Sequence, residues 1–216
     1  MTLSPTDDTY AYDYDHNGEL HGSEDKLIVK PQFTNGSGER RSFLKFDFSD
    51  YGGKTFKKAV LRLCLYGADT PYPSDPSFGY TENRTTELYL TTGNWTEDDL
   101  TWTNQPAEGA HAATFEVPPT VDNWIEIDLT DFLNENMDSL NGGLNLIVKN
   151  ITNGKDQKSR YEFYSKESGD GSKGPQLILE GEDIEYASVT EQISVTTEAG
   201  VAPILPSVVD AVLTNG

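Results

Sequence analysis

Three short segments place lysine and arginine at alternating positions among aromatic residues. The segments are KLIVK at 26–30, RRSFLKF at 40–46 and RYEFYSK at 160–166. Each has the character of a β-strand, in which successive side chains point to opposite faces of the sheet. In the second segment Leu44 and Phe46 then share one face, while Arg41, Phe43 and Lys45 share the other. We therefore predict a core face and, behind it, a row of cations that contains an aromatic ring.

The same alternation groups the cations of the other two segments. Lys26 and Lys30 lie on one face of their strand, and Arg160, Tyr164 and Lys166 lie on one face of theirs. If these strands are neighbours, an acidic protein carries one basic sheet face with aromatic rings. Such a face favours an anionic polymer, because opposite charge attracts the ligand and flat rings stack on it. Arginine suits planar, bidentate binding of a carboxylate, and lysine supplies an adaptable point charge.

A structural role for the same cations is the alternative. Lys45 and Lys166 can instead pair with carboxylates of the chain itself, such as Asp47 or Glu162. Exposed ion pairs of that kind contribute little to stability.

The residues DYDHNGELHGSE at 13–24 fit the pattern of a calcium-binding loop. Oxygen ligands come from Asp13, Asp15 and Asn17, a glycine permits the sharp turn, and Glu24 stands where a carboxylate would close the coordination shell. Strand-like sequence on both sides excludes an EF-hand. We predict a structural calcium site in a β-loop, with a solvated acidic turn as the alternative.

Patterns that indicate catalysis are missing from the sequence. The three histidines have no metal-ligand spacing, and neither a nucleophile elbow nor a phosphate-binding glycine loop occurs. We therefore expect a binding protein and not an enzyme.

The chain is strongly acidic, with a formal net charge of −20 over 216 residues. This charge argues against nucleic acid and anionic membranes as partners. Membrane insertion is also not expected, because no apolar stretch reaches the length of a membrane span. The one cysteine, Cys64, lies in strand-like sequence and is expected to be a buried, inert thiol. We expect a secreted or cell-surface protein whose signal peptide was removed or lies upstream.

Short β-rich runs separated by Gly, Asn and Asp predict an all-β fold, an antiparallel β-sandwich or barrel. One short helix is expected within 130–140, with Thr130 as its cap and Asn141-Gly142-Gly143 as its end. The expected strands are 8–13, 25–32, 40–48, 57–67, 85–92, 100–104, 112–118, 124–129, 144–150, 159–167 and 175–181.

The three tryptophans can be core residues or platforms for a sugar ring. Trp95 and Trp102 adjoin Leu100 and a proline turn, which favours core packing. Trp124 alternates with acidic residues opposite an apolar row, and the pattern leaves its side undecided.

Taken in order, eight segments closely resemble the DNRLRE-type carbohydrate-binding module over about residues 8–181. The resemblance implies a jelly-roll sandwich, and characterised modules of this type bind alginate through cations on a sheet face. Carried onto matching strands, those cations are Lys30, Arg41, Lys45, Arg160 and Lys166. The Arg-x-x-x-Leu element that names the family is replaced by GERRSFLKFD. The eight segments are GELHGSEDKLIVK, RRSFLKFDFS, FKKAVLRLCLYG, NWTEDDLTWTNQP, NWIEIDLTDFL, LNLIVKN, RYEFYSKES and GPQLILEG.

Composition changes after Gly181, where charges become few. The sequence TTEAGVAPILPSVVDAVLTNG resembles the start of a bacterial Ig-like domain. We therefore predict a module over 1–182, followed over 183–216 by a linker and the start of a next domain, so that the module is tethered within a larger protein.

The sequence thus predicts a non-catalytic module that binds an anionic polysaccharide, alginate or another polyuronate. Its predicted contacts are Lys26, Lys30, Arg41, Phe43, Lys45, Arg160, Tyr164 and Lys166. A structural or adhesive stalk domain is the main alternative. In a third, less favoured interpretation the protein is a polysaccharide lyase with Tyr164 as its base.

Overall fold

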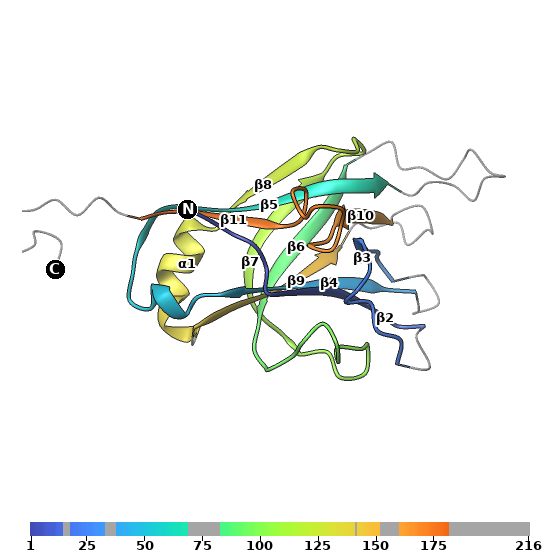
Figure 1. Ribbon diagram of the computed structural model, residues 1–216, viewed down its shortest axis with the longest axis horizontal. Coiled ribbons are helices and arrows are strands. Elements are labelled where there is room, and N and C mark those ends of the chain that lie inside the picture. The colour runs from blue at the N-terminus through green and yellow to red at the C-terminus, as the bar shows by residue number, and fades with distance from the viewer. Residues whose placement is uncertain (15–17, 33–37, 69–82, 141, 152–159, 182–216) are drawn as a thin grey trace, which may run out of the picture. The chain divides into compact units, whose positions relative to one another are not determined.

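The computed structural model describes residues 1–14, 18–32, 38–68, 83–140, 142–151 and 160–181 (Figure 1). The chain divides into two units, Met1–Gly181 and Glu182–Gly216. The second unit lies outside the described residues, and so does all of the segment 183–216 that was predicted to hold a linker and the start of an Ig-like domain.

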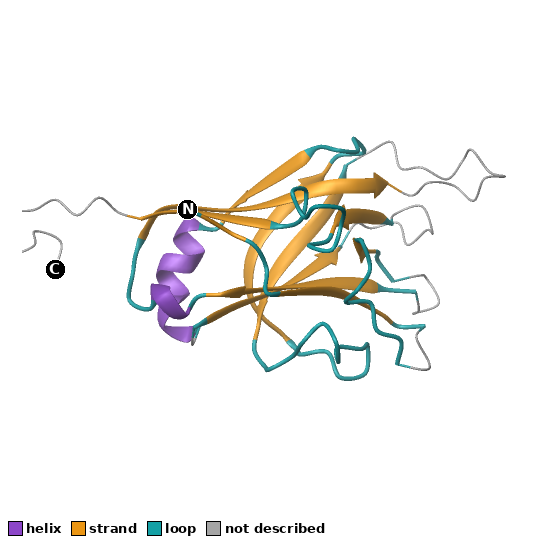
Figure 2. Ribbon diagram, viewed as in Figure 1, coloured by secondary structure: helices purple, strands orange, loops and turns teal. Residues whose placement is uncertain are grey.

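The first unit is an antiparallel β-sandwich, as predicted (Figure 2). The first sheet has the order β1 (Thr2–Leu3), β11 (Gln176–Gly181), β5 (Phe56–Ala68), β10 (Tyr161–Tyr164) and β3 (Lys26–Val29), and β8 (Trp124–Asp128) pairs with the other edge of β5. The second sheet has the order β2 (Asp7–Tyr12), β4 (Arg40–Asp47), β9 (Gly143–Asn150), β6 (Arg84–Thr91) and β7 (Glu108–Val117). From β1 to β6 each strand lies in the opposite sheet from the one before it, a jelly-roll type of connection.

The main core lies between the two sheets and follows the predicted alternation. On β4, Leu44 and Phe46 point into it and are fully buried. On β5, Leu61, Leu63 and Leu65 do the same, while Cys64 points away from this core and is buried on the other side of the strand. Burial raises the pKa of the Cys64 thiol, which keeps it protonated and unreactive.

The strand predicted at 100–104 is wrong. These residues form turns, because short polar side chains bind the local backbone. The side chain of Asn104 accepts a hydrogen bond from the Thr101 N–H at 2.6 Å and donates one to the Asp99 carbonyl at 2.7 Å. The sequence TWTN therefore closes a turn instead of extending.

One short helix, α1 (Thr130–Asn136), continues as a 3₁₀ turn, η2 (Met137–Ser139), and lies at one end of the sandwich (Figure 2). A second 3₁₀ turn, η1, spans Ser49–Tyr51. In the described part of the chain no helix has the length and apolarity needed to cross a membrane.

The predicted cap is wrong in its residue. Leu129 stands at the cap position, and the Thr130 side chain bonds elsewhere. Its hydroxyl accepts a hydrogen bond from the Ala59 N–H at 2.9 Å and donates one to Asp128 at 2.6 Å. Asp128 in turn accepts the Thr130 N–H at 2.9 Å, so the helix start is held by the residue two positions earlier.

A second, smaller core covers the outer face of the second sheet. The cover loop (residues 92–107) follows β6 and lies across this face (Figure 1). Its Trp95 and Leu100 pack on Ala11, Phe43 and Ile147, which point outward from β2, β4 and β9. The predicted core role of Trp95 is confirmed, since this side chain is buried.

Candidate functional site

The predicted basic residues do not share one sheet face. Arg41, Phe43 and Lys45 do lie on one face of β4, as alternation predicted, but β4 belongs to the second sheet. Lys26 and Tyr164 face outward from the first sheet, where they are direct cross-strand partners. The prediction of a single basic face is therefore wrong. The strands with alternating cations lie in different sheets, β4 in the second and β3 and β10 in the first.

Phe43 is not available to stack on a ligand. Its side chain is fully buried beneath the cover loop, with its ring centroid 5.9 Å from that of Trp95 in an edge-on contact. The prediction that Phe43 lies on an open binding face is wrong.

Arg41 is held by carboxylates of its own chain. Its Nε lies 2.6 Å from Glu39 Oε1, its Nη1 lies 3.0 Å from Glu108 Oε1, and its guanidinium stands 5.1 Å from the ring centroid of Trp102. Arg41 thus joins its strand to β7 and to the cover loop.

Lys45 and Lys166 also contact the cover loop. Lys45 Nζ donates to the Trp95 carbonyl at 2.8 Å and lies 3.6 Å from Asp7. Lys166 Nζ donates to Glu97 at 2.8 Å and to the neighbouring Glu167. Although burial acts to lower it, these two carboxylates raise the pKa of Lys166. Both lysines therefore form ion pairs within the chain, as the structural alternative proposed. Their partners are Asp7 for Lys45 and Glu97 and Glu167 for Lys166, and not Asp47 or Glu162.

Two further predicted cations lie next to strands of the first sheet, Lys30 directly after β3 and Arg160 directly before β10. The Lys30 side chain is buried, and its backbone bridges to Arg40 where the two sheets meet. Arg160 pairs with Glu162. For Lys30, Arg41, Lys45, Arg160 and Lys166, ligand binding stays a prediction.

The outer face of the first sheet brings together three aromatic rings, each beside a cation. We name it the aromatic–cation face; it is made of Lys26, Arg62, Tyr66, Trp124, Tyr164 and Lys173. The Arg62 guanidinium lies 4.4 Å from the Trp124 ring centroid, Lys173 Nζ lies 4.8 Å from that of Tyr164, and Lys26 Nζ lies 5.9 Å from that of Tyr66.

The rings of this face form a row across three strands, and Lys26 lies on a fourth strand beside it. Trp124 on β8 stands opposite Cys64 on β5, and Tyr66 follows two positions later on β5. The Tyr66 and Tyr164 rings meet edge-on at 4.9 Å, and Tyr164 on β10 stands opposite Lys26 on β3. Tyr66 is 37% exposed, so the row is open to a ligand in the middle.

Each cation of the face also has a carboxylate close by. Lys26 lies 3.6 Å from Glu162, Arg62 lies 3.1 Å from Glu126, and Lys173 lies 2.7 Å from Asp122. These pairs keep long side chains next to the rings, where a ligand carboxylate can reach them.

Tyr164 is poorly suited to act as a base. Its hydroxyl donates a 2.7 Å hydrogen bond to Asp122, and this bond raises the pKa of Tyr164 because it stabilises the protonated phenol. The arrangement favours hydrogen bonding and charge pairing over proton abstraction.

Sequence reasoning missed Arg62, Tyr66, Trp124 and Lys173. A signal was present for the first two, because the run VLRLCLY places them on the face of β5 opposite the leucines. The sequence pattern does not decide on which side Trp124 lies, and Lys173 lies in a turn where alternation gives no information.

The predicted calcium loop is described only in part, because Asp15 and Asn17 lie outside the described residues. Asp13 Oδ1 accepts the Gly38 N–H at 2.6 Å. Glu24 accepts the Tyr10 hydroxyl at 3.0 Å and lies 2.6 Å from His21 Nδ1. Calcium binding by this loop stays a prediction.

The comparison with known proteins gives one family. A search of curated proteins found no match. Residues 1–181, the whole of the first unit, match the model of carbohydrate-binding module family 96. The chain therefore belongs to carbohydrate-binding module family 96.

Proposed function

We propose that this module binds an anionic polysaccharide, alginate or another polyuronate, on the aromatic–cation face. The observation that carries the proposal is the row of three rings, Trp124, Tyr66 and Tyr164, each within 6 Å of a lysine or arginine on a partly exposed sheet face. Stacking on sugar rings and pairing with uronate carboxylates would then act on the same stretch of chain.

Charge supports an acidic ligand at this place. The protein carries a net charge of −20, which repels a polyanion over most of its surface. On the aromatic–cation face the three cations match the three carboxylates that hold them. A uronate can dock there with less repulsion than elsewhere, and it can share the cations with Glu162, Glu126 and Asp122.

We propose that no bond is broken in this interaction. The raised pKa of Tyr164 disfavours the base that a lyase would need. Incubation with alginate should therefore release no unsaturated product that absorbs in the ultraviolet. Because such polymers lie outside the cell, we expect the module to be secreted or at the cell surface. We also expect it to be tethered to other domains.

The experiment that tests the proposal compares the two outer faces. Affinity is measured by gel retardation and calorimetry against alginate, pectate, hyaluronan and a neutral glucan. We expect Arg62→Ala, Lys26→Ala and Trp124→Ala each to weaken polyuronate binding by roughly 1–3 kcal/mol, the scale of a charge-assisted or stacking contact.

Controls separate this face from diffuse charge. Arg41→Ala removes a cation from the second sheet, and Lys57→Ala removes an exposed one from the far end of β5. Equal losses in both controls would assign binding to net charge, and a larger loss in Arg41→Ala would assign it to the second sheet. A stalk domain would bind none of the four polymers.

A further inference from the structure

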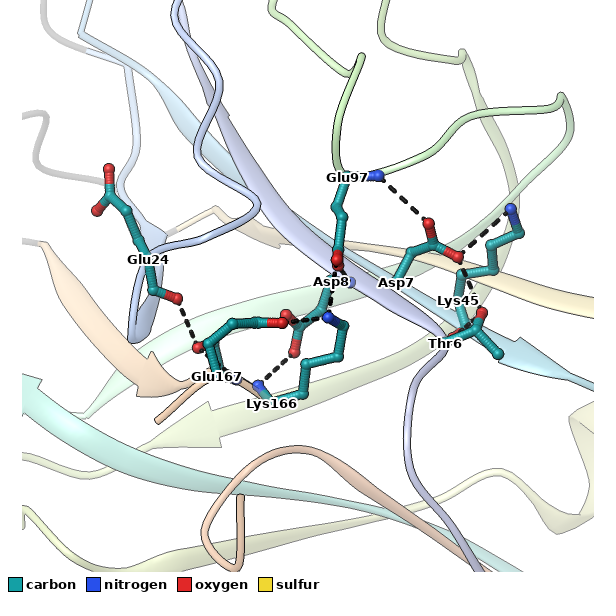
Figure 3. Close-up of polar contacts among 9 residues, drawn as sticks. Thr6, Asp7, Asp8, Glu24, Lys45, Glu97, Lys166 and Glu167 are labelled. Atoms are coloured by element: carbon teal, nitrogen blue, oxygen red, sulfur yellow. Dashed lines mark hydrogen bonds and ion pairs between the residues drawn. The ribbon is translucent and has the colours of Figure 1, made fainter. Parts of the chain in front are cut away.

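Three carboxylates from distant parts of the chain meet beside the cover loop: Asp8 on β2, Glu97 in the cover loop and Glu167 just after β10 (Figure 3). We name them the carboxylate triad. One oxygen from each lies within 4.8 Å of the other two. They join both sheets and the cover loop at one point.

The triad is positioned by its own hydrogen bonds. Glu97 Oε2 accepts the Asp8 N–H at 3.0 Å, and Asp8 Oδ2 accepts the Lys166 N–H at 2.9 Å (Figure 3). Glycine at position 22 allows a close approach here, since a Cβ at that position would lie 2.5 Å from the Glu97 carbonyl oxygen. The carboxylates are therefore held in place before any ligand arrives.

Two oxygens of the triad have no donor among the described residues. Asp8 is only 1% exposed, and its Oδ1 has no hydrogen-bond partner. Glu167 Oε2 is also a buried atom without a hydrogen-bond partner. A buried carboxylate oxygen without a donor costs free energy. Both atoms belong to the group of side chains that converge at this point, which indicates that they face a ligand.

The charge of the cluster points to a divalent cation. The triad holds three carboxylates, and Lys166 Nζ is the one ammonium among the described residues that contacts it, at Glu97 Oε1 and Glu167 Oε1. With all groups ionised, a net charge of −2 is left around Asp8, which is buried. A divalent cation would balance these two charges.

We propose that Asp8, Glu97 and Glu167 bind a calcium ion. Oxygen is the donor that hard cations prefer, and calcium accepts an irregular set of carboxylates completed by carbonyls and water. This site is distinct from the calcium loop predicted at 13–24 and is independent of the proposed polysaccharide. Its ion would tie β2, the cover loop and the end of β10 together.

The test uses the full chain, stripped with chelator and dialysed. Calcium chloride is then titrated by calorimetry, and thermal melts are recorded with and without it. Magnesium chloride and sodium chloride at equal ionic strength serve as salt controls. We expect calcium to raise the melting temperature by several degrees more than either salt, because a ligand that binds only the folded state stabilises it.

Substitutions locate the site. The variants are made in the Asp13→Asn chain, which serves as the parent here, so that the loop predicted at 13–24 does not contribute calcium binding. In this background Glu167→Gln and Asp8→Asn should abolish the calcium response, whereas Asp98→Asn, which changes an exposed carboxylate next to Glu97, should keep it. Both triad variants replace a carboxylate by a neutral group of the same shape. Metal-free, they should melt no lower than the metal-free parent, so the readout stays available. A calcium response that survives both triad substitutions, or no response in the parent chain, overturns the proposal.

Discussion

At the scale of single residues, the outward aromatic of a strand can be a core residue in its own right. Phe43 points away from the main core, and Trp95 covers it completely. Trp95 in turn contacts Lys45 through its carbonyl and its ring face, the latter at 5.6 Å. The cover loop is thus held by packing and by a cation together.

This arrangement makes Trp95 a stability residue. We expect Trp95→Ala to lower the free energy of unfolding by about 3–5 kcal/mol, the usual cost of removing a large buried aromatic side chain. Urea denaturation measures the change. Trp102→Ala is the matched control: this side chain is only partly buried in the same loop, so its loss should be clearly smaller. Equal losses would mean that the cover loop does not depend on the Phe43–Trp95 contact.

Alternation along the sequence predicted the faces of β4 correctly but not their surroundings. Arg41, Phe43 and Lys45 do share a face, since side-chain direction is a local property. What covers that face depends on a loop about fifty residues later in the chain. Which strands neighbour one another also depends on long-range pairing, and so the face that combines Lys26 and Tyr164 with Arg62 and Trp124 could not be predicted from local pattern.

At the scale of elements, a side chain in the middle of helix α1 makes two hydrogen bonds to the start of β5. Asn134 Oδ1 accepts the Phe56 N–H at 2.8 Å, and Asn134 Nδ2 donates to the Phe56 carbonyl at 2.9 Å. Phe56 itself is buried at the start of β5. The helix therefore substitutes for a neighbouring strand at this position.

We expect Asn134→Ala to destabilise the protein by about 1–3 kcal/mol, because it leaves two backbone groups of a buried residue without their partner. Asn136→Ala is the control within the same helix, since its side chain donates only to the Phe132 carbonyl one turn earlier. Denaturant unfolding compares the two. A loss in Asn136→Ala as large as that in Asn134→Ala would contradict a specific link between helix and strand.

The start of α1 should make a pH-dependent contribution to the free energy of unfolding. Hydrogen bonds from the Thr130 hydroxyl and N–H lower the pKa of Asp128. A carboxyl whose folded-state pKa lies below its unfolded value of about 3.9 stabilises the fold above that pH, and this stabilisation is lost as pH falls through the folded-state pKa.

Asp128→Ala should therefore cost about 0.5–1 kcal/mol at pH 7, the scale of a side chain that accepts an N–H at an exposed helix start, and the difference from the parent should shrink below about pH 4. Thermal melts from pH 7 to pH 3 measure it. Glu135→Ala removes one exposed charge from the same helix and should have little effect. A pH-independent difference for Asp128→Ala would assign its role to shape and not to charge.

Most elements of the fold were predictable from the sequence, because a period of two marks strands and glycine marks their ends. Gly142, with φ of +80°, ends the helical segment where the Asn-Gly-Gly run predicted. The failures have a common cause. At 100–104 the side chain of Asn104 binds the local backbone, and this contact outweighs the β-propensity of the segment. The Thr130 hydroxyl binds the Ala59 N–H and therefore does not cap its own helix.

At the scale of the whole molecule, folding and binding should respond to salt in opposite directions. A net charge of −20 repels itself in the compact state, and salt screens that repulsion. Attraction between the aromatic–cation face and a polyuronate is screened by the same ions. Screening lengths fall from about 30 Å at 0.01 M to about 10 Å at 0.1 M ionic strength, so both effects belong to that range.

Between 0.01 M and 0.1 M sodium chloride, with chelator present to exclude calcium, we expect the melting temperature to rise by a few degrees while the affinity for alginate falls severalfold. Calorimetry measures both on one sample series. Arg62→Ala should keep the rise in melting temperature, because net charge is nearly unchanged, and should show a weaker salt dependence of binding. If affinity for alginate does not change while stability rises, then stacking on Trp124, Tyr66 and Tyr164 carries the interaction and the cations of the face serve only to hold those rings in place.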